Sequence, residues 1–156
     1  MGIGFSGLDI YGAHALDTLQ AMVERRGVTA SETGVAAVQC LEGEAVWAAG
    51  STGRFSLELA RAACEAVEAR AEGVAMEDFE YDADLPATAF IIEYRDGFRA
   101  TVLMLTGYVN DFGYAARTTT GETVRCEFVS QRAPAYGGTG APAQGPVAHF
   151  VSIQAT

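Results

Sequence analysis

The sequence predicts an α+β protein with a predominantly antiparallel sheet, two main helices on one face of the sheet and the other face used for oligomerisation. Two segments, 12–26 and 55–72, have the apolar spacing of amphipathic helices. After Gly73 the pattern changes to short strands separated by turn residues. The chain has 156 residues, 49% of them hydrophobic, so we expect a single domain over residues 1–156.

The first half of the chain contains one further predicted strand. The run 33–41 is apolar, rich in β-branched residues and bounded by glycines, which predicts a short buried strand. The helix predicted over 55–72 has a stronger periodic pattern than the first. Either Ser51 or Ser56 is placed to cap its start, and Gly73 is placed to end it.

The strongest strand signal is a hairpin formed by 88–95 and 98–106. Asp96-Gly97 suits a two-residue type I′ turn, which places Ile92 opposite Thr101. The centres of both strands are apolar on both faces, so we expect this hairpin in the middle of a sheet that is covered on two sides.

A second hairpin is predicted from 114–119 and 122–131, turning at 120–121. The segment 133–146 is rich in proline and glycine, and we expect it to be a mobile loop. For the last apolar stretch, 147–153, a strand and a short helix both remain open.

Composition excludes several classes of function. Twenty acidic residues against ten basic ones give a net charge of −10 and a pI near 4.5, which opposes nucleic-acid phosphates and anionic membranes. All ten basic residues are arginine, so lysine chemistry is absent. Cys40, Cys64 and Cys126 indicate neither a disulfide framework nor a zinc site and are expected to be small core residues. With no export or membrane-spanning signal, we expect a cytoplasmic protein.

Two motifs resemble ligand sites without the required context. Residues 2–7 match the GxGxxG dinucleotide pattern, but the pattern requires a preceding strand, so a flexible glycine-rich entry is preferred. The acidic run 77–84 lacks the glycine and distal glutamate of an EF-hand loop and is interpreted as a solvated connector. No metal site is predicted.

The candidate catalytic residue is His14, near the start of the first helix. Asp17 lies one helical turn further on, where a carboxylate can orient the ring or bind hydroxyls, and Tyr11 is a second candidate substrate contact. A local cap with a surface pair is the alternative interpretation of His14 and Asp17. His149, in an apolar stretch, is interpreted as a hydrogen-bonded, partly buried residue.

Three segments together resemble the C-terminal part of an uncharacterised branch of the Gfo/Idh/MocA oxidoreductases. They are GAHALDTLQAMVERR, ETGVAAVQCLEGEAVW and IIEYRDGFRATVLMLTGYVNDFGYAAR, and the resemblance covers roughly residues 9–132. It implies an α+β domain with a large sheet that contacts another subunit. Family members often carry D-x-x-x-H at the start of the first helix, and the histidine acts on the substrate hydroxyl. His14 matches the histidine, Ile10 stands at the aspartate position, and Asp9 lies one place earlier.

The resemblance also implies what this chain lacks. In the family, a Rossmann domain with a catalytic lysine binds NAD(P), and this sequence contains no lysine. The leading hypothesis is therefore a substrate-side and oligomerisation domain that binds no cofactor alone and uses NAD(P) only with a Rossmann-containing partner. Whether the chain is an enzyme stays open. The substrate implied is a small hydroxylated molecule.

Two alternatives stay open. One is a stand-alone cofactor-free enzyme or ligand-binding protein, with His14 as acid/base in a cleft between the first helix and the sheet. The other is a pseudoenzyme subunit of a larger assembly. The leading hypothesis also expects that charges placed on the exposed face of 98–106 would produce monomers or aggregates.

Overall fold

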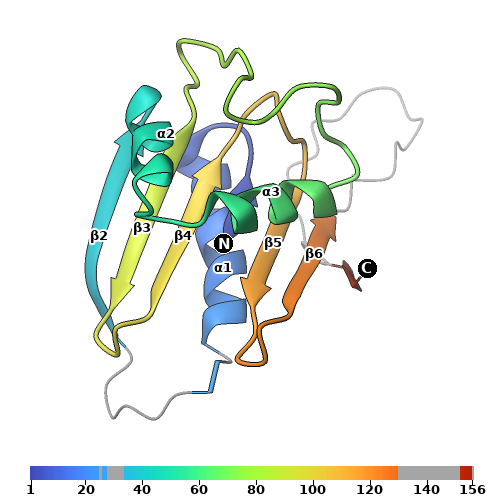
Figure 1. Cartoon of the computed structure of the whole chain (residues 1–156). Coiled ribbons are helices and arrows are strands. Elements are labelled where there is room, and N and C mark those ends of the chain that lie inside the picture. Colours follow the sequence, from blue (N-terminus) through green and yellow to red (C-terminus); the bar gives the residue numbers. More distant parts are fainter. Residues whose placement is uncertain (25, 28–33, 130–151, 156) are drawn as a thin grey trace, which may run out of the picture.

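The computed structural model of the chain describes residues 1–24, 26–27, 34–129 and 152–155, and they form one mixed sheet with helices (Figure 1). The strand order is β2-β3-β4-β1-β5-β6-β7, and β1 and β4 are the one parallel pair among neighbouring strands. The strands are β1 (Gly2–Gly4), β2 (Val35–Glu42), β3 (Thr88–Tyr94), β4 (Arg99–Met104), β5 (Phe112–Arg117), β6 (Thr123–Val129) and β7 (Ser152–Ala155). The α+β class and the predominantly antiparallel sheet are confirmed.

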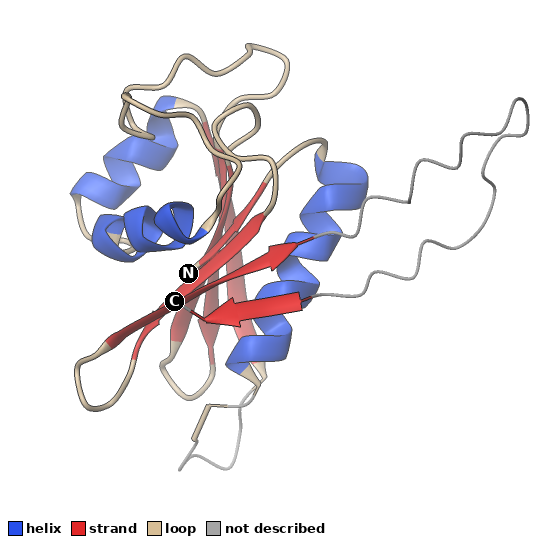
Figure 2. Ribbon diagram, turned by 90° about the vertical axis from the view of Figure 1, so that its right-hand side faces the viewer, coloured by secondary structure: helices blue, strands red, loops and turns tan. Residues whose placement is uncertain are grey.

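Helices cover both faces of the sheet, which differs from the predicted placement (Figure 2). The helix α1 (Ala13–Val23) lies on one face, whereas α2 (Glu44–Ser51) and α3 (Leu57–Ala66) lie on the other. Alternate residues of β4 show this division: Val102 packs in the cluster containing α1, and Leu103 packs in the cluster containing α3. The prediction that both main helices lie on one face of the sheet was therefore wrong.

The β3–β4 hairpin forms as predicted, but its register differs by one residue. Ile92 lies opposite Ala100, not Thr101, because the loop contains three residues and not two. The Tyr94 N–H donates to the Phe98 carbonyl at 2.9 Å, and Gly97 has a φ of +82°. A three-residue loop ending in a left-handed glycine is the next most common hairpin connection after the two-residue turn.

The strand β4 is buried on both faces from Ala100 to Met104, which confirms the prediction of a strand covered on two sides. No exposed face of 98–106 exists for a partner to cover, apart from Phe98 and Arg99 at the hairpin end. The surface available for association must therefore be sought elsewhere on the sheet.

The glycine-rich start of the chain is a central strand. Residues Gly2–Gly4 form β1 between β4 and β5, so the prediction of a flexible glycine-rich segment at this point was wrong. A side chain on Gly4 would come within 2.8 Å of Ala15 and of Met104, so this glycine lets α1 approach the sheet closely. Because these glycines serve packing in a strand, the segment does not fit a nucleotide-phosphate loop.

The helix α3 starts as predicted and ends early. The Ser56 hydroxyl accepts the Leu59 N–H at 3.1 Å and caps the helix. The helix ends at Ala66, six residues before the predicted end. It stops there because the backbone after it forms hydrogen bonds with distant parts of the chain instead of continuing the helix. The buried Glu127 side chain of β6 accepts the Glu68 N–H at 2.9 Å. The short helix α2 was not predicted at all.

The second hairpin is confirmed as β5 and β6, with Arg117 opposite Thr123. The predicted loop 133–146 lies outside the described residues, as does His149. Of the undecided stretch 147–153, the last two residues belong to strand β7, which pairs with β6.

Candidate functional site

The start of α1 carries an aromatic cluster that includes two of the predicted site residues. The Tyr11 ring packs 5.0 Å from Phe5 and 6.5 Å from Phe112, between ring centres. The His14 ring meets Tyr11 edge-on at 6.3 Å with an interplanar angle of 87°. Tyr11 and His14, two of the predicted site residues, therefore lie side by side in the structure. Asp17 is exposed one turn further along the helix.

The backbone leading into this cluster is unusual. Ser6 has a φ of +67°, and within the described part of the chain it is the one non-glycine residue in the left-handed region. It is held by the Thr106 hydroxyl, which donates to the Ser6 carbonyl at 3.3 Å. The next residues, Leu8–Gly12, form a π-helical turn directly before α1. Strained residues and π-turns are both frequent at functional sites.

A groove of about 640 Å³ lies between α1 and strands β2 and β3. Its apolar walls come from Leu16, Leu19 and Ile92, and from two exposed valines of β2, Val35 and Val38. A volume of this size falls within the range of small-molecule sites.

None of the three predicted site residues is among the described residues that line this groove. The groove uses the flank of α1 that carries Leu16 and Gln20, whereas Tyr11 contacts Phe112 of β5 on the opposite flank. A cleft beside the first helix was predicted correctly. The structure does not place Tyr11, His14 and Asp17 in it.

Arg26 also lines the groove, and the sequence analysis did not identify it as a site residue. Its guanidinium carbon lies 4.6 Å from the Tyr94 ring centre and 4.7 Å from that of Phe98. Its Nη2 donates to the Asp96 carboxylate at 2.6 Å, and its Nη1 donates to the Val23 carbonyl at 3.0 Å. The end of α1 is thereby fixed to the β3–β4 turn. No sequence signal links Arg26 to a partner 70 positions away.

The Arg26–Asp96 pair predicts an acid-sensitive component of stability. Burial alone would raise the pKa of the Asp96 carboxyl, but hydrogen bonds from Arg26 and from the Phe98 N–H outweigh it and lower the pKa. A lowered folded-state pKa gives stability that is present above the unfolded-state value and lost as the pH falls through the folded-state value. We therefore expect Asp96→Asn to lower the melting temperature at pH 7, and this deficit to shrink below about pH 4, near the ordinary aspartate pKa.

The measurement is the melting temperature of both proteins from about pH 7 down to about pH 3, a range that spans ordinary carboxyl titration. Asp78→Asn is the matched control, because it removes the same charge from an exposed position. A deficit of Asp96→Asn that stays constant across this range would contradict the prediction.

An apolar area along β2, which includes the β2 wall of the groove, is left uncovered by the helices. We call it the β2–β3 patch, and it consists of the exposed Val35, Val38 and Cys40 of β2 and the half-buried Phe90 of β3. The strand β2 lies at one end of the sheet, and every residue from Val35 to Cys40 is exposed. The prediction that 33–41 is a strand is confirmed, whereas its predicted burial was wrong, because β2 has a sheet neighbour on one side only.

The prediction that the three cysteines are small core residues is confirmed for two of them. Cys64 and Cys126 are buried core residues, as predicted, whereas Cys40 is exposed on β2. Burial raises the pKa of the Cys64 thiol to about 12, with the Glu77 charge as the next cause. Burial and then the Glu42 charge raise the pKa of Cys40. Neither thiol is set up as a nucleophile, which needs a lowered pKa.

Across the described ranges, no three or more histidine, cysteine, aspartate or glutamate side chains gather where they could hold a metal ion. Within the same residues, no helix combines the length and apolar character needed to cross a bilayer.

Comparisons with known proteins identified no relative of this chain. Searches against protein-family models, curated proteins and solved structures found no match. The fold and its open patch thus define the class of protein here: an α+β domain with an uncovered apolar edge and an aromatic cluster at a helix start.

Proposed function

We propose that this chain is a self-associating, substrate-side domain, resembling the C-terminal domain of a Gfo/Idh/MocA oxidoreductase, in which a second copy covers the β2–β3 patch. The observation that carries the proposal is the exposure of β2. Val38 is 59% exposed and Val35 49% exposed on a strand at one end of the sheet. Exposed apolar edges invite pairing with another chain.

The composition of β2 supports this interpretation. Sheets usually protect an edge with charged side chains or proline, and β2 has neither from Val35 to Leu41. Its first charged residue is Glu42. The bulge between Val35 and Ala37 disturbs one end of the strand alone. A chain with a net charge of −10 that keeps this segment uncharged has a surface suited to a partner of the same apolar character.

The substrate-side part of the proposal rests on the start of α1. His14 matches the family's histidine, and its ring packs against Tyr11 beside the Ser6 turn. In the proposal, this end of the helix faces a small hydroxylated molecule. NAD(P) would come with a Rossmann-containing partner, since the GxGxxG segment of this chain begins as the central strand β1 and does not fit a nucleotide-phosphate loop.

Val38→Arg tests the self-association. A guanidinium on β2 is expected to disfavour the apolar contact while the fold is kept, because position 38 is exposed within one copy. Native mass spectrometry and light scattering should show a dimer or larger oligomer for the wild type and a monomer for the variant. Cys40 should also be alkylated faster in the variant, because it lies in the β2–β3 patch.

Val124→Arg is the matched control. Val124 is 41% exposed on β6, away from β2, so the variant should keep the wild-type mass. A wild type that is monomeric at about 100 μM, well above the Kd of a micromolar complex, would overturn the proposal, as would an oligomer unaffected by Val38→Arg. A wild-type chain held only by a larger Rossmann-containing protein would favour the pseudoenzyme alternative.

A further inference from the structure

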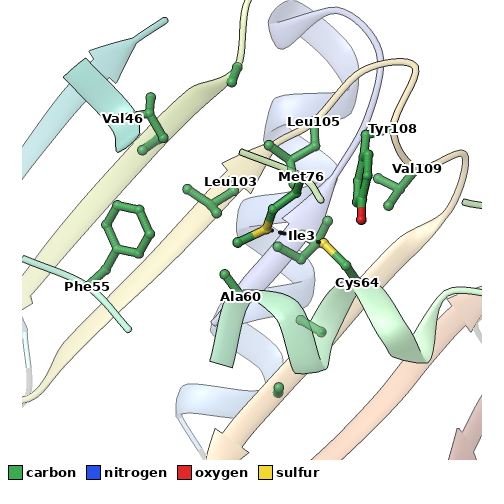
Figure 3. Packing of buried hydrophobic residues seen from close by; sticks show 14 of the residues in the cluster. Ile3, Val46, Phe55, Ala60, Cys64, Met76, Leu103, Leu105, Tyr108 and Val109 are labelled. Carbon is green, nitrogen blue, oxygen red and sulfur yellow. Dashed lines mark hydrogen bonds between the residues drawn. The ribbon is translucent and has the colours of Figure 1, made fainter. Parts of the chain in front are cut away.

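The outer side of β2 is a part of the sheet that neither helix layer covers. On the α3 face, Figure 3 shows Ala60 and Cys64 of α3 packed beside Ile3 and Leu103 of the sheet. On the other face, α1 packs against the strands in the same way. The strand β2 lies at one end of the sheet, so one of its two sides has no neighbouring strand among the described residues (Figure 1). That side is open to a further strand.

The pairing of β2 with β3 determines which of its backbone groups point away from the sheet. The Gly43 N–H donates to the Ala87 carbonyl at 2.8 Å, and the same register continues back to Ala37. In an antiparallel ladder, hydrogen bonding to one neighbour alternates along the strand. The odd-numbered residues of this stretch therefore bond to β3. The even-numbered residues direct their N–H and C=O groups outward, and they are Val38, Cys40 and Glu42.

The opposite side of β3 gives the same assignment. The Tyr94 N–H donates to the Phe98 carbonyl at 2.9 Å, so the even-numbered residues of β3 bond to β4. Its odd-numbered residues then bond to β2, and one of them is Ile91, which lies opposite Gln39. The backbone of Gln39 is therefore used inside the sheet, whereas that of Cys40 is not.

The outward groups lie on a regular stretch of strand. Bulges commonly end strand pairing, and the bulge of β2 lies before this stretch, between Val35 and Ala37. Every residue from Val35 to Cys40 is exposed, and Glu42 is the one charged residue of β2. The edge thus keeps an uncharged, evenly spaced row of donors and acceptors up to its last residue.

We infer that β2 pairs antiparallel with β2 of a second copy, so that one sheet continues through both copies. This inference rests on the self-association proposed above and adds how the two copies join. Two such edges are self-complementary, because each outward residue offers one N–H and one C=O. Antiparallel pairing keeps the two Glu42 carboxylates apart, whereas parallel pairing in register sets them side by side, and like charges directly opposite are destabilising. The result is a closed two-fold dimer with no β2 edge left over.

The apolar side chains agree with this arrangement. Val38 lies opposite Ile92 and Cys40 lies opposite Phe90, and both β3 residues pack in the cluster on the α1 face. Residues directly opposite each other in a ladder share a face of the sheet. Pairing through the even-numbered residues therefore sets the β2–β3 patch of one copy beside that of the other, on the same face of the joined sheet. Each patch then covers part of the other.

Amide hydrogen exchange of the full chain, followed by NMR, tests the backbone pairing. We expect the amides of Cys40 and Glu42 to exchange at least about tenfold more slowly in the wild-type dimer than in the Val38→Arg monomer, because pairing hydrogen-bonds them. The amides of Gln39 and Leu41 face β3 and should be protected in both proteins, so they serve as the internal reference.

Cys40→Pro removes one outward N–H from each copy. Proline is tolerated on an edge strand when its missing N–H faces solvent, so the fold should be kept. The Kd of the dimer, measured by light scattering on dilution, should rise at least about tenfold. Cys40→Ala is the matched control, because it changes the side chain and keeps the N–H, and its Kd should stay within about threefold of the wild type. If Cys40→Pro folds poorly, the exchange measurement on the wild type still decides.

The outcomes separate this inference from the self-association itself. A wild type that is monomeric at about 100 μM overturns both. A dimer that Val38→Arg dissociates, but whose Cys40 and Glu42 amides exchange as fast as in that variant, overturns edge pairing alone, because the copies then meet through side chains. A dimer that a folded Cys40→Pro leaves intact, or that Cys40→Ala weakens equally, also overturns edge pairing, because the outward N–H then has no role.

Discussion

Val102→Asp is expected to abolish folding of the chain. Val102 is fully buried in the centre of β4 and packs in the same cluster as Leu19 of α1. Its neighbours across the sheet are Gly2 of β1 and Phe90 of β3, and neither can pair with a carboxylate. Burying an unpaired charge costs several kcal/mol, which is comparable with the total stability of about 5–15 kcal/mol of a typical domain.

Circular dichroism and thermal unfolding measure this effect directly. Val124→Asp introduces the same side chain at a valine that is 41% exposed on β6, and it should leave the transition within a few degrees of the wild type. A Val102→Asp protein with a wild-type spectrum and a cooperative transition would show that α1 does not cover this face of the sheet.

The contrast between Val102 and Val38 also separates folding from association. Both are valines on strands of one sheet, but β4 lies inside the sheet and β2 lies at its end. A charge at position 102 should remove the fold, whereas a charge at position 38 should remove the partner and keep the fold. Loss of folding in both variants would mean that β2 is part of the core and not an interface.

Local patterns were enough to predict most elements, because helices and hairpins are encoded by neighbouring residues. The apolar period of α1 and the serine cap of α3 lie within each element, and the β3–β4 hairpin is encoded by its own turn residues. The hairpin register was wrong by one residue because Asp96-Gly97 is compatible with both a two-residue and a three-residue loop. The choice depends on Gly97 alone taking the left-handed conformation.

The arrangement of the elements was less predictable. The period of α1 shows which side of the helix is apolar, but not which face of the sheet receives it. The apolar run of β2 is typical of a buried strand, and its place at the end of the sheet depends on the pairing of distant strands. The early end of α3 depends on Glu127, which lies 59 positions after Glu68.

The same reasoning applies to the candidate sites. Tyr11 and His14 lie side by side because they are three residues apart on one helical segment, a proximity that the sequence spacing predicts. Arg26 with Asp96, and Glu77 with Arg61, meet only through tertiary folding. The acidic run that contains Glu77 was interpreted as a solvated connector, and its composition gives no signal that one carboxylate turns inward.

Gly113→Ala is expected to be the most destabilising glycine substitution. Gly113 lies in β5 beneath α3, and a Cβ there would come within 2.3 Å of the Ala63 carbonyl oxygen and 3.0 Å of the Val67 side chain. The obstacle is the backbone of a helix, which cannot turn aside as a flexible side chain would. We expect a loss of roughly 3 kcal/mol, at the upper end of overpacking effects, measured by denaturant unfolding.

Gly27→Ala is the matched control, because a Cβ at Gly27 meets nothing within 4 Å and its φ is not in the left-handed region. Its effect should stay within about 0.5 kcal/mol, as for other surface substitutions. A small effect of Gly113→Ala would mean that α3 can move away from β5 at little cost.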